Sequence, residues 1–255
     1  MSESDQSGGT DAFGPLDDAI EAVLTPWRSM REPLTLLLSG GVDSGLLAWE
    51  LRNVPALRAI TVGMDGSPDL ADARASAATI GVDWVPRTLS AEDVRRARSE
   101  VEPLVAGLPP TTQRVLTAFA LAVEHSPSAV TLCGQGADEL FLGYAHFRGL
   151  PREELQRRAD LDLATLRDRD WPLSQQIGTR LGKKVVAPYL EPAFVRAARS
   201  VPLAVLDSGG TPKGFFRRWA MHRGLPEMVA LRPKRALQYG SGVDRILRPQ
   251  RRERA

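Results

Sequence analysis

The sequence contains a single cysteine, Cys133, among its 255 residues. One cysteine excludes an internal disulfide framework and any zinc or iron–sulfur site built from several cysteines, and the three histidines lack metal-ligand spacing. No apolar run approaches the ~20 residues that span a bilayer, and the polar stretch from Met1 to Thr10 does not resemble a signal peptide. We therefore expect a cytoplasmic protein without a membrane segment.

The chain as a whole carries little excess of either charge, because its formal net charge is only +2. The charge is unevenly distributed, since residues 213–255 hold 12 basic and 3 acidic side chains. Such asymmetry indicates that the C-terminal part faces an anion, and both polyphosphate and RNA fit that description. The last residues, 246–255, are expected to form a solvated basic tail.

The most informative stretch is Ser39-Gly40-Gly41-Val42-Asp43-Ser44. An apolar run over residues 33–38 precedes it and a helical apolar pattern over 45–51 follows, as where a buried strand enters a helix. Adjacent glycines allow positive φ and let backbone N–H groups approach a ligand, and a helix N-terminus favours an anion. The stretch lacks the G-x-x-x-x-G-K-[ST] pattern, so it is not a Walker loop. By itself it also fits an ordinary strand-helix turn.

Further strands are predicted over residues 57–64, 83–88 and 129–133, with helices over 15–30, 67–80 and 111–124 and a capping box at Ser90–Asp93. Strands that alternate with helices predict an α/β fold with a parallel, doubly wound sheet. The loops after Leu38, Met64 and Cys133 then lie at the same sheet edge, where such folds bind ligands. Cys133 is interpreted as a small buried residue there rather than a nucleophile.

Several motifs occur together in one order. Gly63-Met64-Asp65-Gly66-Ser67-Pro68-Asp69-Leu70 follows the first loop, and Cys133-Gly134-Gln135-Gly136-Ala137-Asp138-Glu139-Leu140-Phe141-Leu142-Gly143-Tyr144 follows later. Val186-Ala187-Pro188-Tyr189-Leu190-Glu191 and the basic segment Arg232-Pro233-Lys234-Arg235 complete the set. Over residues 34–245 the chain resembles the synthetase domain of asparagine synthetase and its β-lactam-forming relatives, within the N-type ATP pyrophosphatase (PP-loop) superfamily.

The resemblance implies an adenine nucleotide alpha hydrolase-like fold, and changes in composition and pattern along the chain divide it into four parts. These are a disordered tail (1–14), a PP-loop ATP-binding α/β region (15–150), a helical lobe that completes the active site (151–245) and the basic tail (246–255). It also implies an ATP- and Mg²⁺-dependent ligase that activates a small carboxylate as an acyl-adenylate, releases pyrophosphate and transfers the acyl group to ammonia or another amine. We expect no nucleic acid partner and leave a homodimer open.

The same resemblance assigns the candidate site residues. The catalytic candidates are Lys234, Asp138 and Gln135, and the Mg²⁺ ligands are Asp43 and Asp138. The nucleotide-binding candidates are Leu38, Ser39, Gly40, Gly41, Asp43, Ser44, Val62, Met64, Cys133 and Gly134. Carboxylate oxygens are ligands that Mg²⁺ prefers, and a lysine stabilises the charge of departing pyrophosphate.

The chain also departs from the family pattern. Ser2 stands where the glutamine-using members have a cysteine nucleophile, so ammonia is expected to come free or from a separate glutaminase subunit. Gln135 replaces a glutamate, or a tyrosine in the β-lactam branch, and glutamine cannot accept a proton as a general base. Val186 and Lys184 replace a family Arg and Glu, which leaves asparagine open as the product. Two alternatives remain: a PP-loop tRNA-modifying enzyme and a non-catalytic ATP-binding homologue.

Overall fold

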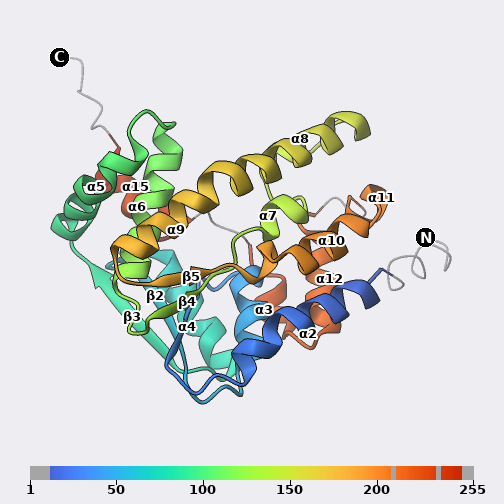
Figure 1. The fold of residues 1–255 in the computed structure, drawn as a ribbon, viewed down its shortest axis with the longest axis horizontal. Coiled ribbons are helices and arrows are strands. Elements are labelled where there is room, and N and C mark those ends of the chain that lie inside the picture. Colours follow the sequence, from blue (N-terminus) through green and yellow to red (C-terminus); the bar gives the residue numbers. More distant parts are fainter. Residues whose placement is uncertain (1–11, 208–210, 234–236, 249–255) are drawn as a thin grey trace.

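The structure is a computed structural model, and it describes residues 12–207, 211–233 and 237–248. Its sheet has five parallel strands in the order β3-β2-β1-β4-β5 (Figure 1). The strands are β1 (Leu34–Leu37), β2 (Leu57–Met64), β3 (Trp84–Leu89), β4 (Val130–Leu132) and β5 (Lys184–Val186). The predicted parallel α/β sheet is therefore confirmed, and β5 adds a fifth strand from the segment assigned to the helical lobe.

Helices connect and flank these strands. The longer ones are α2 (Gly14–Arg28), α3 (Val42–Leu51), α4 (Pro68–Ile80), α5 (Ala91–Val105), α6 (Pro110–Glu124), α8 (Arg152–Thr165), α9 (Trp171–Arg180), α10 (Pro192–Ser200) and α12 (Gly214–His222). The short ones are α7 (Ala137–Leu140), α11 (Leu203–Leu206), α13 (Glu227–Ala230), α14 (Leu237–Gly240) and α15 (Val243–Leu247). Short 3₁₀ turns occupy Ala145–Phe147 and Pro188–Leu190, and a π-helical turn, Leu166–Asp170, joins α8 to α9.

Alternation along the strands explains why helices cover both faces of the sheet. Leu34 and Leu36 of β1 face a core that also contains residues of α2, α3, α10 and α12. Leu37 packs on the opposite side, against clusters formed with α5 and α6. Successive side chains of a strand point to opposite faces, so both faces of β1 are apolar, as a buried parallel strand requires. Figure 1 shows the two groups of helices on either side of the sheet.

The start of α5 confirms the predicted capping box, and the start of α4 is built differently. The Ser90 hydroxyl accepts a hydrogen bond from the Asp93 N–H, and the Asp93 carboxylate accepts from the Ser90 N–H, which is the predicted capping box. At α4 the N-cap residue is Ser67, but its side chain makes no capping hydrogen bond. The Pro68 ring, with its fixed φ, begins this helix instead.

The strand order places a topological switch point between β1 and β4. The chain adds β2 and β3 on one side of β1 and then returns to add β4 and β5 on the other. The connections that leave β1 and β4 therefore diverge, which opens a crevice at the carboxyl ends of these two strands. The loop 38–41 and the loop 133–136 border this crevice, as the sequence predicted. Among the described residues no helix is long and apolar enough to span a membrane.

Candidate active site

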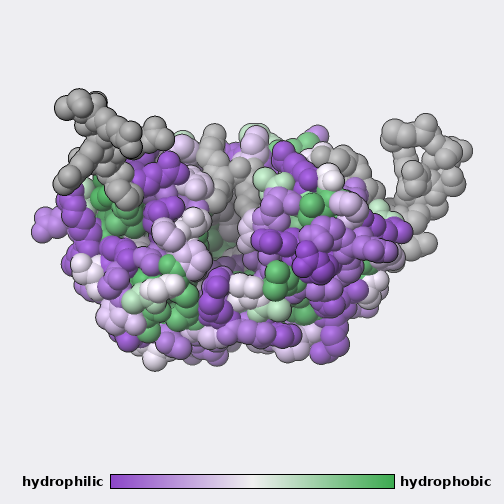
Figure 2. Space-filling model, turned by 90° about the horizontal axis from the view of Figure 1, so that it is seen from above, coloured by the Kyte–Doolittle hydropathy of each residue, from purple (hydrophilic) through white to green (hydrophobic). Residues whose placement is uncertain are grey.

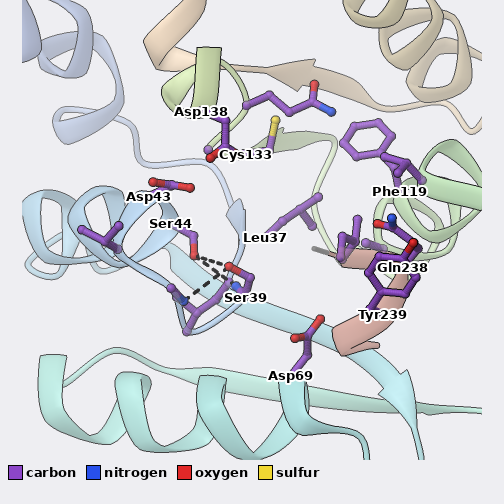
Figure 3. A pocket seen from close by; sticks show the side chains of 18 of the residues that line it. Leu37, Ser39, Asp43, Ser44, Asp69, Phe119, Cys133, Asp138, Gln238 and Tyr239 are labelled. Carbon is purple, nitrogen blue, oxygen red and sulfur yellow. Dashed lines mark hydrogen bonds between the residues drawn. The ribbon is translucent and has the colours of Figure 1, made fainter. Parts of the chain in front are cut away.

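The loop after β1 is fixed by hydrogen bonds and by its contact with α4. The Ser39 N–H donates to the Ser44 hydroxyl at 3.1 Å, and the two hydroxyls are also 3.1 Å apart (Figure 3). Gly40 has φ +81° and packs directly on the backbone of Asp72 and Ala73, so a side chain at Gly40 would overlap with α4. This close approach explains why position 40 is a glycine. It also directs the N-terminus of α3 toward the crevice.

One lysine connects the two loops at the switch point. The ammonium nitrogen of Lys213 is 2.6 Å from Asp43 Oδ1, in the first turn of α3, and 2.7 Å from Asp138 Oδ1, in the first turn of α7. Lys213 precedes α12 with φ +58°, a left-handed conformation that is rare for a residue with a side chain. We call Lys213, Asp43 and Asp138 the lysine–aspartate cluster.

The environment of Lys213 keeps it charged. Its side chain is 2% exposed, and burial alone would lower the pKa of the ammonium group. The nearby charges of Asp138 and Asp43 outweigh this effect and raise the pKa of Lys213 above its usual value. Gly143 lies so close that a side chain there would overlap with Asp138 and Lys213. The cluster is therefore tightly packed around a permanent positive charge.

A cavity of about 560 Å³ lies beside the cluster at the carboxyl edge of the sheet. Of the residues predicted from the sequence, the cavity is lined by Leu38, Ser39, Gly41, Asp43, Ser44, Val62, Cys133, Gly134, Gln135 and Asp138. Gly40 and Met64 do not line it, because Gly40 packs on α4 and Met64 packs against Gly242. Lys234 lies outside the described residues. Figure 2 shows one face of the molecule hollowed near its middle between hydrophilic surfaces.

Two basic residues of the cavity were missed by the sequence analysis, Lys213 and Arg217. Arg217 is 7% exposed, and its guanidinium donates to the carbonyl oxygens of Pro212 and Arg232, each at 3.1 Å, and to that of Ala230. Burial lowers the pKa of Arg217 from its usual value, and the negative charges of Asp43 and Asp138 oppose this effect only in part. In the sequence these two residues are recognisable only as basic side chains four positions apart at the start of a helix.

A buried carboxyl group lies next to the cluster. Glu139 is 9% exposed and accepts a hydrogen bond from the Tyr144 hydroxyl, and both residues line the cavity. Burial, with a further contribution from the negative charge of Asp138, raises the pKa of Glu139 to about 7. In the sequence Glu139 stands out only as part of the motif at residues 133–144. In the fold it is a carboxyl group that changes protonation near neutral pH.

Comparison with known proteins agrees with these motifs and their geometry. The family model described as asparagine synthase matches residues 21–185 and 152–255. This chain belongs to the asparagine synthase family. The matches together cover the sheet, the cavity and the helices that follow, so the resemblance predicted from the sequence is confirmed.

Relatives within the asparagine synthase family are similar over most of this chain. A glutamine-hydrolyzing asparagine synthetase from Arabidopsis thaliana is 27% identical over 84% of this chain and 40% of that protein. One from Gallus gallus is 29% identical over 80% of this chain and 39% of that protein. The chain thus spans about two fifths of the length of these relatives.

Among solved structures, an NH3-dependent NAD synthetase from Campylobacter jejuni has a TM-score of 0.36 with 14% identity, covering 73% of this chain and 91% of that one.

The carboxylates of the site could bind a divalent cation only together with other ligands. Among the described residues no group of three or more His, Cys, Asp or Glu side chains is arranged to bind a metal ion. Asp43 and Asp138 do converge, and about a fifth of each side chain is exposed to the cavity. Two carboxylates beside the Ser-Gly-Gly loop are too few to enclose a cation, so a cation held there would need most of its oxygen ligands from a bound molecule. The donor set therefore suits Mg²⁺ bound together with a polyphosphate.

Cys133 occupies the end of β4 as the sequence predicted. Its side chain is buried at 5% exposure, and burial raises the pKa of the thiol to about 12. A buried thiol with a raised pKa carries little thiolate near neutral pH, which agrees with a small buried side chain at this position. Its neighbour Gln135 directs a carboxamide into the site, and the buried Oε1 atom has no hydrogen-bond partner within the described part of the chain.

Proposed function

We propose that this chain is an ATP-dependent, amide-forming ligase. A small carboxylic acid attacks the α-phosphate of ATP, which gives an acyl-adenylate and pyrophosphate. Ammonia or another amine then attacks the acyl carbon, forms the amide bond, releases AMP and loses one proton. The observation that carries this proposal is the lysine–aspartate cluster, which places a buried cation and two carboxylates beside the Ser-Gly-Gly loop and the cavity.

The basic residues have a direct role in the first step. Negative charge accumulates on the β- and γ-phosphates as pyrophosphate leaves, and fixed positive groups stabilise that charge. Lys213 and Arg217 line the cavity from α12, while the backbone N–H groups of the loop 39–41 lie at the N-terminus of α3. Lys234, assigned by the family resemblance, is proposed to complete this positively charged wall.

Asp43 and Asp138 would bind Mg²⁺ together with the phosphate oxygens. When bound, the cation would neutralise charge on the leaving pyrophosphate. The two carboxylates already share the ammonium group of Lys213, which orients both toward one point of the cavity. Lys213 therefore has a second proposed function, because it limits the repulsion between two carboxylates that must lie close together.

The amine must lose a proton in the second step, and Gln135 cannot accept it. We assign this role to Glu139, a cavity-lining carboxyl group with a pKa of about 7. A base with a pKa near the working pH is effective because a large fraction is unprotonated while it still binds a proton well. Gln135 is proposed to accept a hydrogen bond from the amine through its unpartnered Oε1 atom and so to orient it.

The source of the amine is part of the same proposal. The matched proteins from Arabidopsis thaliana and Gallus gallus are named as glutamine-hydrolyzing, and this chain spans about two fifths of their length. We propose that ammonia comes from solution or from a separate glutaminase subunit. Adding purified glutaminase and glutamine in place of ammonium chloride would test whether an external supply supports amide formation.

ATP–pyrophosphate exchange tests the proposed reaction. The wild-type chain is incubated with ATP, Mg²⁺, labelled pyrophosphate and a panel of small carboxylic acids, and exchange that requires one acid supports the ligase. Asp138→Asn should reduce this exchange more than tenfold, which corresponds to about 1.4 kcal/mol of activation free energy. Exchange that requires tRNA instead would support the tRNA-modifying alternative. ATP binding without any exchange would support the non-catalytic one.

A further inference from the structure

The cavity contains a second buried carboxamide whose oxygen lacks a partner. Gln238, on α14, is 3% exposed and lines the cavity. Its Oε1 atom is buried and accepts no hydrogen bond from the described residues. A buried amide oxygen without a donor is unfavourable, and a native protein usually retains one only where another molecule supplies the donor. Gln238 was not among the residues predicted from the sequence.

The position of Gln238 follows from how α14 packs on the sheet. The Met64 N–H, at the end of β2, donates to the carbonyl oxygen of Ser241 at 2.8 Å. Leu237 packs against the apolar cluster that contains Val62 and against the one that contains Cys133. Gly240 contacts the Asp69 carboxylate so closely that a side chain at Gly240 would overlap with it. These contacts fix α14 across the carboxyl end of β2.

The two ends of the cavity differ in chemistry. Figure 3 shows Gln238 and Tyr239 beside Phe119 at one end, and Asp43 and Asp138 at the other, with Leu37 between them. The charged end contains the Ser-Gly-Gly loop and suits phosphates. The end at Gln238 has apolar walls from α6, including Phe119, and its polar groups include the Gln238 carboxamide and the Asp69 carboxylate. Apolar walls with a buried carboxamide, which both donates and accepts, suit a flat heterocycle that carries a donor beside an acceptor.

We propose that Gln238 selects the adenine base of ATP, an inference that depends on the proposed function because it assumes a nucleotide in this cavity. Its Oε1 atom accepts a hydrogen bond from the exocyclic amino group, and its Nε2 group donates to an adjacent ring nitrogen. This pairing matches a glutamine with adenine, since the carboxamide and the base present complementary donors and acceptors at similar spacing. Binding of ATP then supplies the missing donor to Oε1.

The experiment compares ATP with purine riboside 5′-triphosphate, which is ATP without the amino group. The wild-type chain should bind ATP about tenfold more tightly by calorimetry, because the analogue leaves Oε1 without a partner. Gln238→Met removes both hydrogen-bonding groups, and its preference for ATP should fall below about twofold. Gln176→Met, at an exposed position on α9, is the matched control and should keep the full preference.

Thermal unfolding without nucleotide separates ligand recognition from a structural role. Gln238→Met should have a Tm equal to or higher than wild type, because the substitution removes a buried polar group that has no partner. A variant that unfolds at lower Tm, or loss of folding in both Gln238→Met and Gln238→Leu, would assign a structural role and overturn the inference. A folded variant that still prefers ATP would overturn it as well.

Nucleotide binding and pyrophosphate exchange by the wild-type chain also separate a failure of this inference from a failure of the proposed function. A wild-type chain that exchanges pyrophosphate but binds both nucleotides equally would leave the ligase intact and remove the role of Gln238. A wild-type chain that binds neither nucleotide would remove the proposed function itself, and the inference with it.

Discussion

Lys213 and Asp43 lie 170 positions apart in the chain, and the ammonium nitrogen of Lys213 is 2.6 Å from Asp43 Oδ1. Asp138 Oδ1 is 2.7 Å from the same nitrogen. One buried cation therefore joins the start of α12 to the loops that follow β1 and β4. The site is complete only when the C-terminal helices have packed on the sheet, so its stability and its chemistry depend on the same contacts.

Removing this cation should destabilise the fold. Lys213→Met leaves two carboxylates close together without a counter-ion, and breaking a buried ion pair typically costs about 3–5 kcal/mol. We expect urea unfolding at pH 7 to show a loss of unfolding free energy near the lower end of this range, because about a fifth of each aspartate side chain is exposed. Lys184→Met, at an exposed position on β5, is the control and should stay within about 0.5 kcal/mol of wild type.

The stability effects of Lys213→Met and Asp138→Asn should be energetically coupled. Asp138→Asn should cost at least about 1 kcal/mol less in the Lys213→Met background than in wild type, because the partner of Asp138 is already absent. A double-mutant cycle on the free energies of unfolding measures this difference. Additive effects would mean that the 2.7 Å contact contributes nothing to stability.

Gly143 should not tolerate a side chain. Its added Cβ atom would overlap with the Asp138 carboxylate and the Lys213 side chain, so Gly143→Ala must displace one of them. We expect a loss of about 1–3 kcal/mol of stability, as overpacking usually causes, and a more than tenfold decrease in ATP–pyrophosphate exchange. Gly14→Ala, where a Cβ atom meets nothing within 4 Å, is the matched control. Equal activity in both variants would contradict the proposed geometry.

Gln135→Glu introduces a carboxylate where the family pattern has a glutamate. If amide formation is limited by proton removal from the amine, this variant should form amide faster near pH 7 while its rate of adenylation is unchanged. Single-turnover measurements of acyl-adenylate formation and aminolysis separate the two steps. Unchanged aminolysis would show that Glu139, or another base, already accepts the proton efficiently.

Glu139 should make stability depend on pH. The pKa of Glu139 is raised from 4.5 in a model peptide to about 7 in the fold, so the folded state binds more protons between these values. Stability from this group is fully present below pH 4.5 and is lost as pH rises through 7. Glu139→Gln should therefore lose less stability than wild type between pH 5 and pH 8 in urea unfolding. Parallel pH profiles of the two proteins would contradict the raised pKa.

The sequence by itself determined the sheet and the edge at which the site lies. β1, β2 and β4 are mainly apolar local runs, and local patterns of this kind do not depend on distant contacts. Once the strands were predicted to be parallel, the loops after Leu38 and Cys133 had to meet at one edge. The motifs on these loops indicated the family, which the comparison confirms.

Tertiary structure decided which side chains complete the cavity. Lys213 reaches the two aspartates only because its left-handed backbone and the packing of α12 direct it there, and neither property has a local sequence signal. The burial of Gln238 likewise depends on how α14 packs across the end of β2, and a local sequence pattern does not reveal that packing. Long-range packing brings these residues together, so their roles could be inferred only from the folded chain.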